Sequence, residues 1–261
     1  MKSRVRVAAL LLSGLSLYAQ TPPSAPVRPE VLESHSYVRR FSMGATLSVL
    51  AFHLIPNRTT DSVVSSPPSD SIYTTTGATD LWHRVGYGVT AQAAITERFA
   101  INAGLFMRRA AYRKNSDIFE GTDNPTTLAD ERRHTIRNED TRARFFDLPV
   151  TIRYYGKDRH QPGWRWFGEI GGAVRRASGI RTSTDTTIGT GTTSCCSTTP
   201  IMPTKRNARG AVAGLGLQFI DDFGIRIVPG VRYTRWVDQT FNASSTGTQR
   251  NQVEATISLT F

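Results

Sequence analysis

Long apolar segments are nearly absent from this chain of 261 residues, which excludes a bundle of membrane-spanning helices. One apolar segment stands out, residues 7–18, which follows Lys2, Arg4 and Arg6 and precedes the small residue Ala19. A basic start, an apolar core of about a dozen residues and a small residue form the pattern of a secretory signal peptide. A membrane-spanning helix needs about 20 apolar residues, so this segment is too short to be one.

This apolar segment divides the chain into three expected parts. We expect a signal peptide over residues 1–19, a proline-rich linker over 20–38, and one β-rich domain over 39–261. Export also changes the meaning of the net charge of +11. Inside a cell such a charge suggests nucleic acid, whereas an exported chain more naturally meets anionic lipid headgroups or surface polysaccharide.

Cysteine is scarce as well. The chain contains two cysteines, Cys195 and Cys196, and they are adjacent. Neighbouring Cα atoms lie about 3.8 Å apart, less than the roughly 4.4–6.8 Å of an unstrained disulfide. A strained vicinal disulfide, a bond to another chain and two free thiols all remain open. No further ligands stand at a spacing that predicts a metal site.

Motifs of known hydrolytic enzymes are also missing, because the chain has neither HExxH nor GxSxG. His53 and His83, with Asp80 nearby, fall at the ends of two neighbouring predicted strands, where they would form an acid–base or metal-binding site at a rim. Ordinary polar rim residues are the simpler explanation. His134 and His160 lie in connections without an evident partner. We therefore predict no enzymatic activity, no cofactor and no metal.

What the chain does contain is alternation of apolar and polar residues. Residues 253–261 alternate without a break and end on Phe261. A period of two is typical of a strand with one apolar and one polar face. The same alternation predicts eight strands, at about 41–54, 81–95, 99–112, 144–155, 164–178, 208–220, 224–236 and 250–261.

Short and long connections alternate between these strands. The short connections cover 96–98, 156–163 and 221–223, and the long ones cover 55–80, 113–143, 179–207 and 237–249. This asymmetry is typical of an all-β, antiparallel, up-and-down transmembrane β-barrel, which has long outer loops and short turns on the other side. An even number of strands places both ends of the barrel on the side of the short turns.

A soluble barrel of the lipocalin type would alternate too, with its apolar face inward. Two features favour a membrane instead. Aromatic residues cluster near the predicted strand ends, as an interfacial girdle requires: Phe99, Phe146, Tyr154, Trp164, Trp166, Phe219, Tyr233 and Phe261. The opposite faces carry charges that suit a narrow lumen with paired charges: Arg84, Asp147, Arg153, Arg165, Glu169, Arg226, Arg232 and Glu254.

One strand also resembles a known family. Residues 145–155, FFDLPVTIRYY, resemble a strand of the outer-membrane β-barrel domain families, grouped with the PorT-like and OmpX- or OmpA-like small barrels. The last strand, which ends on Phe261, is similar to the final strand of those barrels. The resemblance implies a barrel in the bacterial outer membrane, with outer-membrane lipids and the barrel assembly machinery as partners and Phe261 as an assembly signal. It implies no particular activity.

The charged residues allow several interpretations. Arginines on neighbouring faces would pair with the predicted lumen carboxylates, which favours a structural plug over a gated ion path or an acid–base set. Arg108, Arg109, Arg113 and Lys114 open the second long connection and are candidate contacts for lipid phosphates, because the guanidinium fork matches phosphate. A solvated loop with internal salt bridges is an equal alternative.

The expected function follows from these patterns. We expect a non-enzymatic protein with a structural or surface-interaction role, whose four outer loops meet an extracellular ligand of unknown identity. A narrow channel for small ions or solutes is the first alternative, and an outer-membrane enzyme acting on lipid is the second. A pore needs a continuous water path and an enzyme needs a converged nucleophile and base, so the contents of the lumen separate these functions.

Overall fold

The computed structural model describes residues 40–261 except 57, 67–68, 81–83, 123–125, 159–162, 190–191, 198–202, 222 and 244–245, and the side chains of 62–83 and 190–202 lie outside the description. The predicted signal peptide and nearly all of the predicted linker fall outside these residues. The elements are β1 Phe41–Leu50, β2 Thr60–Ser66, β3 Ser69–Asp80, β4 Val85–Ala94, β5 Phe99–Glu120, β6 Arg133–Tyr155, β7 Gly163–Ile188, β8 Thr192–Ser197, β9 Asn207–Ile220, β10 Arg226–Trp236 and β11 Asn251–Thr260. In this described part, no helix is long and apolar enough to cross a membrane.

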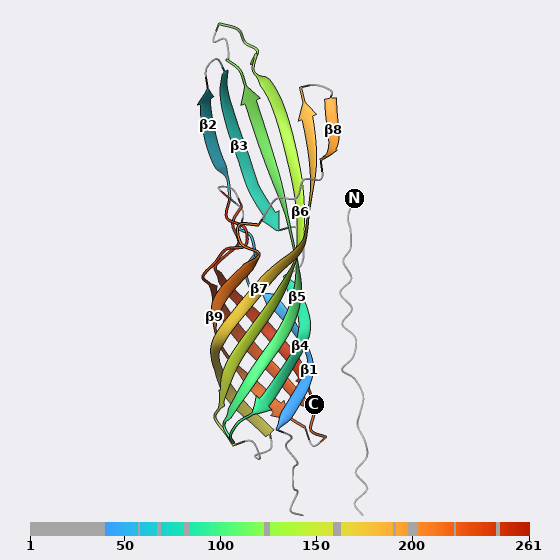
Figure 1. Cartoon of the computed structure of the whole chain (residues 1–261), viewed down its shortest axis with the longest axis vertical. Coiled ribbons are helices and arrows are strands. Elements are labelled where there is room, and N and C mark those ends of the chain that lie inside the picture. Colours follow the sequence, from blue (N-terminus) through green and yellow to red (C-terminus); the bar gives the residue numbers. More distant parts are fainter. Residues whose placement is uncertain are drawn as a thin grey trace, which may run out of the picture. The chain divides into compact units, whose positions relative to one another are not determined.

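Eight of the strands close into a ring (Figure 1). The hydrogen-bonded order is β1, β4, β5, β6, β7, β9, β10 and β11, and every neighbouring pair is antiparallel. The ring closes between the first and last strands, from Gly44 opposite Thr260 to Leu50 opposite Glu254. The eight-stranded up-and-down barrel predicted from the alternation is therefore confirmed, and each predicted segment contains a barrel strand.

The seam of the ring continues to Phe261. The backbone N–H of Phe261 donates to the carbonyl of Met43 at 3.0 Å, and the N–H of Met43 donates back at 3.1 Å. The Phe261 ring itself is exposed on the outside of the barrel. Its role as an assembly signal stays a prediction.

The apolar faces of the strands point outward. Eight apolar residues, one on each barrel strand, have exposed fractions between 47% and 70%: Leu47, Val89, Leu105, Val150, Ile170, Leu215, Val231 and Ile257. Along the same strands the residues between them are mostly buried in the lumen, as in the alternating burial of β1 and β10. The orientation predicted from parity is confirmed, and a lipocalin-type arrangement with an apolar interior is excluded.

Three of the connections predicted to be loops instead contain strands. β5, β6 and β7 continue beyond the barrel, where β3 pairs with β5, β2 pairs with β3, and β8 pairs with β7 (Figure 1). We call this extension the outer sheet: β2, β3 and β8 with the outer ends of β5, β6 and β7. β5 changes its neighbour from β4 to β3 after Arg108, so the hydrogen bonding of the barrel passes directly into the outer sheet. Repeated threonines suit strands, because β-branched side chains fit a pleated surface.

A β-bulge marks the boundary between the barrel and the outer sheet. The register between β6 and β7 shifts between Arg142 and Arg144, and Gly179 on β7 has a φ of +59°. The left-handed conformation favours glycine at this position. The extra residue also changes which face of β7 is covered, because Ala177 is buried below the bulge and Thr182 above it.

An apolar cluster closes the outer mouth of the barrel. We call it the cap cluster, and its buried members are Leu50, Leu54, Ile55, Ala110, Tyr112, Ala143, Phe145, Ala177 and Phe241. The rings of Tyr112 and Phe145 lie 5.6 and 6.2 Å from the ring of Phe241, which the connection after β10 supplies. The carbonyl of Leu54 accepts a hydrogen bond from the backbone N–H of Gln249, so two connections meet over the mouth.

Candidate functional site: the charged lumen

The lumen holds an unusual concentration of buried charge. Six arginine side chains lie on the inner faces of the barrel strands, each in a residue no more than 6% exposed: Arg108, Arg153, Arg165, Arg175, Arg226 and Arg232. Three carboxylates face them: Asp147, Glu169 and Glu254. Burying one charge without a partner is costly, so the stability of the barrel depends on how these groups pair.

The central network is a row of cross-strand partners. Arg153 on β6 is opposite Glu169 on β7, and its Nε donates to Glu169 Oε2 at 2.7 Å. Arg232 on β10 is opposite Glu254 on β11, and its Nη1 donates to Glu254 Oε1 at 3.4 Å. Gly214 on β9 lies between the two pairs, opposite both Glu169 and Arg232.

Gly214 allows the two pairs to join. An added Cβ there would lie 2.9 Å from Glu169 Oε1, in the space where Arg232 Nε donates to that oxygen at 3.0 Å. Glu254 also accepts from Arg108 Nη2 at 2.8 Å, across the lumen from β5. The result is one chain of alternating charges from Arg153 to Arg108, in which each of the two glutamates meets two arginines.

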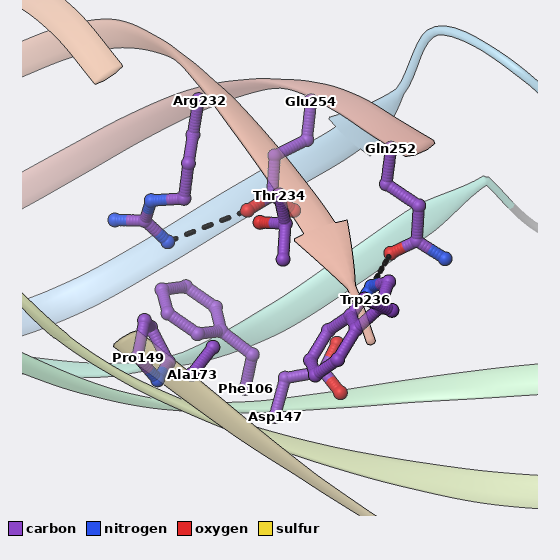
Figure 2. Close-up of a pocket in the computed structure, with 9 residues that line it drawn as sticks. All are labelled: Phe106, Asp147, Pro149, Ala173, Arg232, Thr234, Trp236, Gln252 and Glu254. Carbon is purple, nitrogen blue, oxygen red and sulfur yellow. Dashed lines mark hydrogen bonds and ion pairs between the residues drawn. The ribbon is translucent and has the colours of Figure 1, made fainter. Parts of the chain in front are cut away.

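A second network lies beside the cap cluster. Arg175 on β7 binds Asp147 on β6 through two hydrogen bonds of 2.6 and 2.7 Å, the bidentate geometry of a strong charge-assisted pair. Its guanidinium carbon lies 4.2 Å from the centre of the Trp236 ring, a cation–π contact. Gln252 accepts from Arg175 at 2.9 Å. It also accepts from Trp236 at 2.9 Å (Figure 2).

The end of the lumen near the short connections is filled by aromatic and amide groups. Arg165 donates to Gln218 at 3.0 Å and lies 3.9 Å from the centre of the Tyr155 ring. The Tyr155 hydroxyl donates to Gln92 at 2.9 Å. Arg226 donates to the hydroxyl of Ser42 at 3.1 Å. Polar side chains therefore fill the lumen along its length.

Little free space remains between the two networks. A cavity of about 10 Å³ lies there, bordered by the nine residues of Figure 2. About 10–15 Å³ is needed to hold one water molecule. The arginine–carboxylate chain occupies this level of the lumen, and this cavity has room for about one water molecule.

Most of the residues predicted to line the lumen lie there, but Arg84 does not. Arg84 precedes β4 at the outer mouth and is exposed, and its Nη2 lies 2.8 Å from His53 Nε2. The expectation that Arg84 belongs to the lumen network was wrong, because its position is beyond the end of the barrel wall. His83 and His160 lie outside the described residues, so the proposed pairing of His53 with His83 is not described.

The four predicted lipid-phosphate contacts divide into three groups. Arg108 is in the lumen and bonded to Glu254, so its assignment to the outside was wrong. Arg113 pairs with Asp140 at 2.7 Å, and Lys114 lies 3.9 Å from Glu139. Arg109 is exposed on the outer face of β5.

Sequence reasoning missed several lumen residues that parity could have identified. Arg175 shares its face of β7 with Arg165 and Glu169, and Arg108 shares its face of β5 with Ala100 and other buried residues. Three glutamines complete the networks: Gln92, Gln218 and Gln252. An uncharged amide in an alternating strand does not by itself indicate a lumen partner, so the sequence did not single them out.

The other candidate sites have simpler contacts. His134 is stacked on Phe119, with ring centres 4.4 Å apart, and its Nε2 lies 3.6 Å from Asp117. Within the described residues, no group of three or more His, Cys, Asp or Glu side chains is placed to hold a metal ion. Cys195 and Cys196 belong to β8, and their side chains lie outside the description.

Comparisons with known proteins identify no family. No family model and no curated protein matches this chain. Among solved structures, it is similar to the outer membrane protein OprG from Pseudomonas aeruginosa, with 8% identity, a TM-score of 0.39, and coverage of 85% of this chain and 94% of that one. It is also similar to Ail, the attachment invasion locus protein of Yersinia pestis, with 8% identity, a TM-score of 0.31, and coverage of 85% and 96%.

Proposed function

We propose that this chain is a non-enzymatic β-barrel protein of the bacterial outer membrane, with a structural or surface-interaction role carried by its outer sheet. The observation behind the proposal is the reversed distribution of polarity. Large apolar side chains cover the outside of the ring, and paired charges fill its inside. In water this arrangement exposes a continuous apolar surface, whereas in a bilayer both faces are satisfied.

The dimensions of the apolar surface support the same proposal. From Phe99 to Arg109 on β5, the outer face rises about 25 Å along the barrel axis, given the usual rise and tilt of barrel strands. That height matches the apolar band of outer-membrane barrels, which is about 25 Å. The last apolar residue before Arg109 on this face is Met107.

Aromatic side chains border the band at the short-connection end. The Tyr154 ring lies 5.2 Å from Phe99 and 5.9 Å from Trp166, and Trp164 lies 5.1 Å from Phe219. Tryptophan and tyrosine are enriched where hydrocarbon meets headgroups. This aromatic belt supports a membrane interface at that end.

The filled lumen favours a structural role over conduction. The charge chain from Arg153 to Arg108 and the cap cluster fill much of the lumen, and the cavity between the two networks holds about one water. The outer sheet is then the part of the protein that an extracellular partner meets first. We expect low conductance in planar bilayers.

Cysteine labelling in intact bacteria tests the proposal. In a background with Cys195 and Cys196 changed to serine, Leu128→Cys places a thiol at a fully exposed position between β5 and β6, and Lys157→Cys places one in a short connection at the opposite end. A membrane-impermeant maleimide should label Leu128→Cys in intact cells, and Lys157→Cys only after the cells are broken. Equal labelling of both before lysis, or recovery of the folded protein in the soluble fraction, contradicts the proposal.

A further inference from the structure

Above the apolar band, the outer faces of β5, β6 and β7 carry two pairs of arginines at directly opposite positions. Arg109 on β5 is directly opposite Arg144 on β6, and Arg142 on β6 is directly opposite Arg181 on β7. All four are exposed. We call them the arginine quartet.

The quartet combines two like-charged cross-strand pairs. Directly opposite residues on antiparallel strands have Cβ atoms about 4.5–5.5 Å apart, and like charges at that distance are destabilising. No ion pair of these four arginines occurs within the described part of the chain. The nearest acidic residue on the same face of β6, Asp140, already binds Arg113 at 2.7 and 3.2 Å.

The four side chains border a hollow rather than a flat surface. A pocket of about 440 Å³ is lined by the quartet together with Ala110, Ala111, Ala143 and Gly179. The alanines and the glycine of the β-bulge leave the space open, because none of them has a side chain larger than a methyl group. Pockets of about 300–1,000 Å³ are typical of small-ligand sites.

The position of the hollow indicates its ligand. On the outer faces of β5 and β6, the quartet follows Met107 and Phe146, which are opposite each other and end the apolar band. The next outward position is about 5 Å further along the axis. If the band occupies hydrocarbon, the quartet lies at the level of the lipid headgroups.

Resting on the proposed membrane location, we infer that the arginine quartet binds the phosphate groups of an outer-leaflet lipid. A guanidinium presents a planar fork that matches phosphate oxygens, and two facing forks suit a group with more than one negative charge. A bound phosphate would also relieve the repulsion within each arginine pair. A lipid anchored in this way would hold the barrel at a fixed depth and cover one side of the outer mouth.

The test uses folded, detergent-solubilised full-length protein and a glycolipid that carries two phosphate monoesters. Titration should raise the unfolding temperature of the wild-type protein, because a ligand that binds only the folded state stabilises it. The same lipid without its phosphates should have no effect. Inorganic pyrophosphate should bind far more weakly, since it lacks the acyl chains that hold the headgroup against the barrel.

A charge-matched control separates the site from general attraction. Arg109→Gln with Arg142→Gln should weaken binding roughly tenfold or more, because hydrogen bonds to charged groups are lost. Arg235→Gln with Arg250→Gln removes the same charge from exposed positions on β10 and just before β11, and should change binding less than twofold, a change near the limit of measurement. In neutral detergent without lipid, the first variant should unfold at the same temperature as wild type or higher, which shows that it folds.

Any of three results overturns the inference. The phosphorylated lipid fails to raise the unfolding temperature of the wild-type protein, both double variants lose the same lipid affinity, or pyrophosphate and lipid bind with equal affinity. The last would assign the hollow to a free anion. None of these results bears on membrane location. Failure of the labelling experiment in cells would instead overturn the proposed function, whatever the micelle titration shows.

Discussion

The two faces of β5, β6 and β7 both carry arginine, but the residues opposite those arginines differ in charge. On the inner face, Arg153 and Arg175 each meet a carboxylate directly opposite on the neighbouring strand. On the outer face, Arg109 and Arg144 meet each other. On the same strands, arginine therefore faces carboxylates in the lumen and faces other arginines on the outer surface.

The difference follows from access to solvent. A lumen filled with side chains hydrates a charge poorly, so buried guanidinium groups need partners built into the wall, such as the carboxylates of Glu169 and Asp147. At the outer rim, water and ions reach the arginines and reduce their repulsion. Paired charges in the lumen therefore serve the fold, and unpaired charges at the rim remain available for a ligand.

The largest expected effect comes from breaking the inner pairing. Glu169→Gln leaves Arg153 and Arg232 without the carboxylate that binds both, in a part of the lumen closed to water. Removing one partner from a buried ion pair costs about 3–5 kcal/mol of unfolding free energy. Urea-induced unfolding in detergent micelles, followed by the mobility of the folded form on gels, should show this loss.

An exposed ion pair provides the control for Glu169. Asp140→Asn removes the carboxylate that binds Arg113, and both side chains are substantially exposed. Such a pair adds little in water, so this variant should unfold at nearly the wild-type urea concentration. Equal destabilisation by the two variants would contradict the distinction between paired lumen charges and solvated ones.

A smaller effect is expected from Arg175→Lys, which keeps the charge and changes its shape. The ammonium group of lysine cannot make both hydrogen bonds to Asp147, nor lie flat against Trp236 as the guanidinium does. We expect a loss of roughly 1.5–3 kcal/mol of unfolding free energy, the value of a hydrogen bond to a charged group. Tryptophan fluorescence should report the altered contact. An unchanged midpoint would mean that charge alone stabilises this network.

The barrel could be predicted from the sequence, and the outer sheet could not. Each barrel strand has one face in lipid-like surroundings and one in a polar lumen, so its residues alternate clearly. In the outer ends of β6 and β7 the buried residues are polar, such as Thr141 and Thr182, so apolar alternation is missing there. The outer end of β5 shows an irregular burial pattern from Arg113 to Glu120. Without alternation, Thr60–Ser66 and Ser69–Asp80 resemble a polar loop in sequence.

The charge network was only partly accessible to sequence reasoning. Parity placed Glu169 and Arg153 on inner faces, and the same rule would have placed Arg175 and Arg108 there. The contact between Arg108 and Glu254 crosses the lumen from β5 to β11, passing over two intervening strands. Such a contact depends on the diameter of the closed ring, which no periodicity in the sequence records.

The smallest expected effect concerns a charge that is fully solvated. Asp130, in the connection between β5 and β6, accepts from Arg132 Nε and Nη2 at 2.8 and 2.7 Å. These hydrogen bonds lower the pKa of Asp130 from 3.8 to about 2. A lowered pKa means that any stabilisation is complete above the ordinary value and is lost as the pH falls toward 2. Because this carboxylate is exposed, we expect that loss of the Arg132 hydrogen bonds changes the pKa of Asp130 without a measurable change in the free energy of unfolding.

A carbon-13 titration of the Asp130 carboxyl group, in protein kept folded in micelles, measures this shift directly. Arg132→Gln should return the pKa toward its ordinary value, because the two side-chain hydrogen bonds are lost. Lys205→Gln is the matched control, since Lys205 lowers the pKa of Asp238 instead. If Arg132→Gln also lowered the unfolding midpoint as much as Glu169→Gln does, solvent access would not be what separates the two classes of charge. If only the titration moves, the contrast between the hydrated rim and the closed lumen extends to single carboxylates.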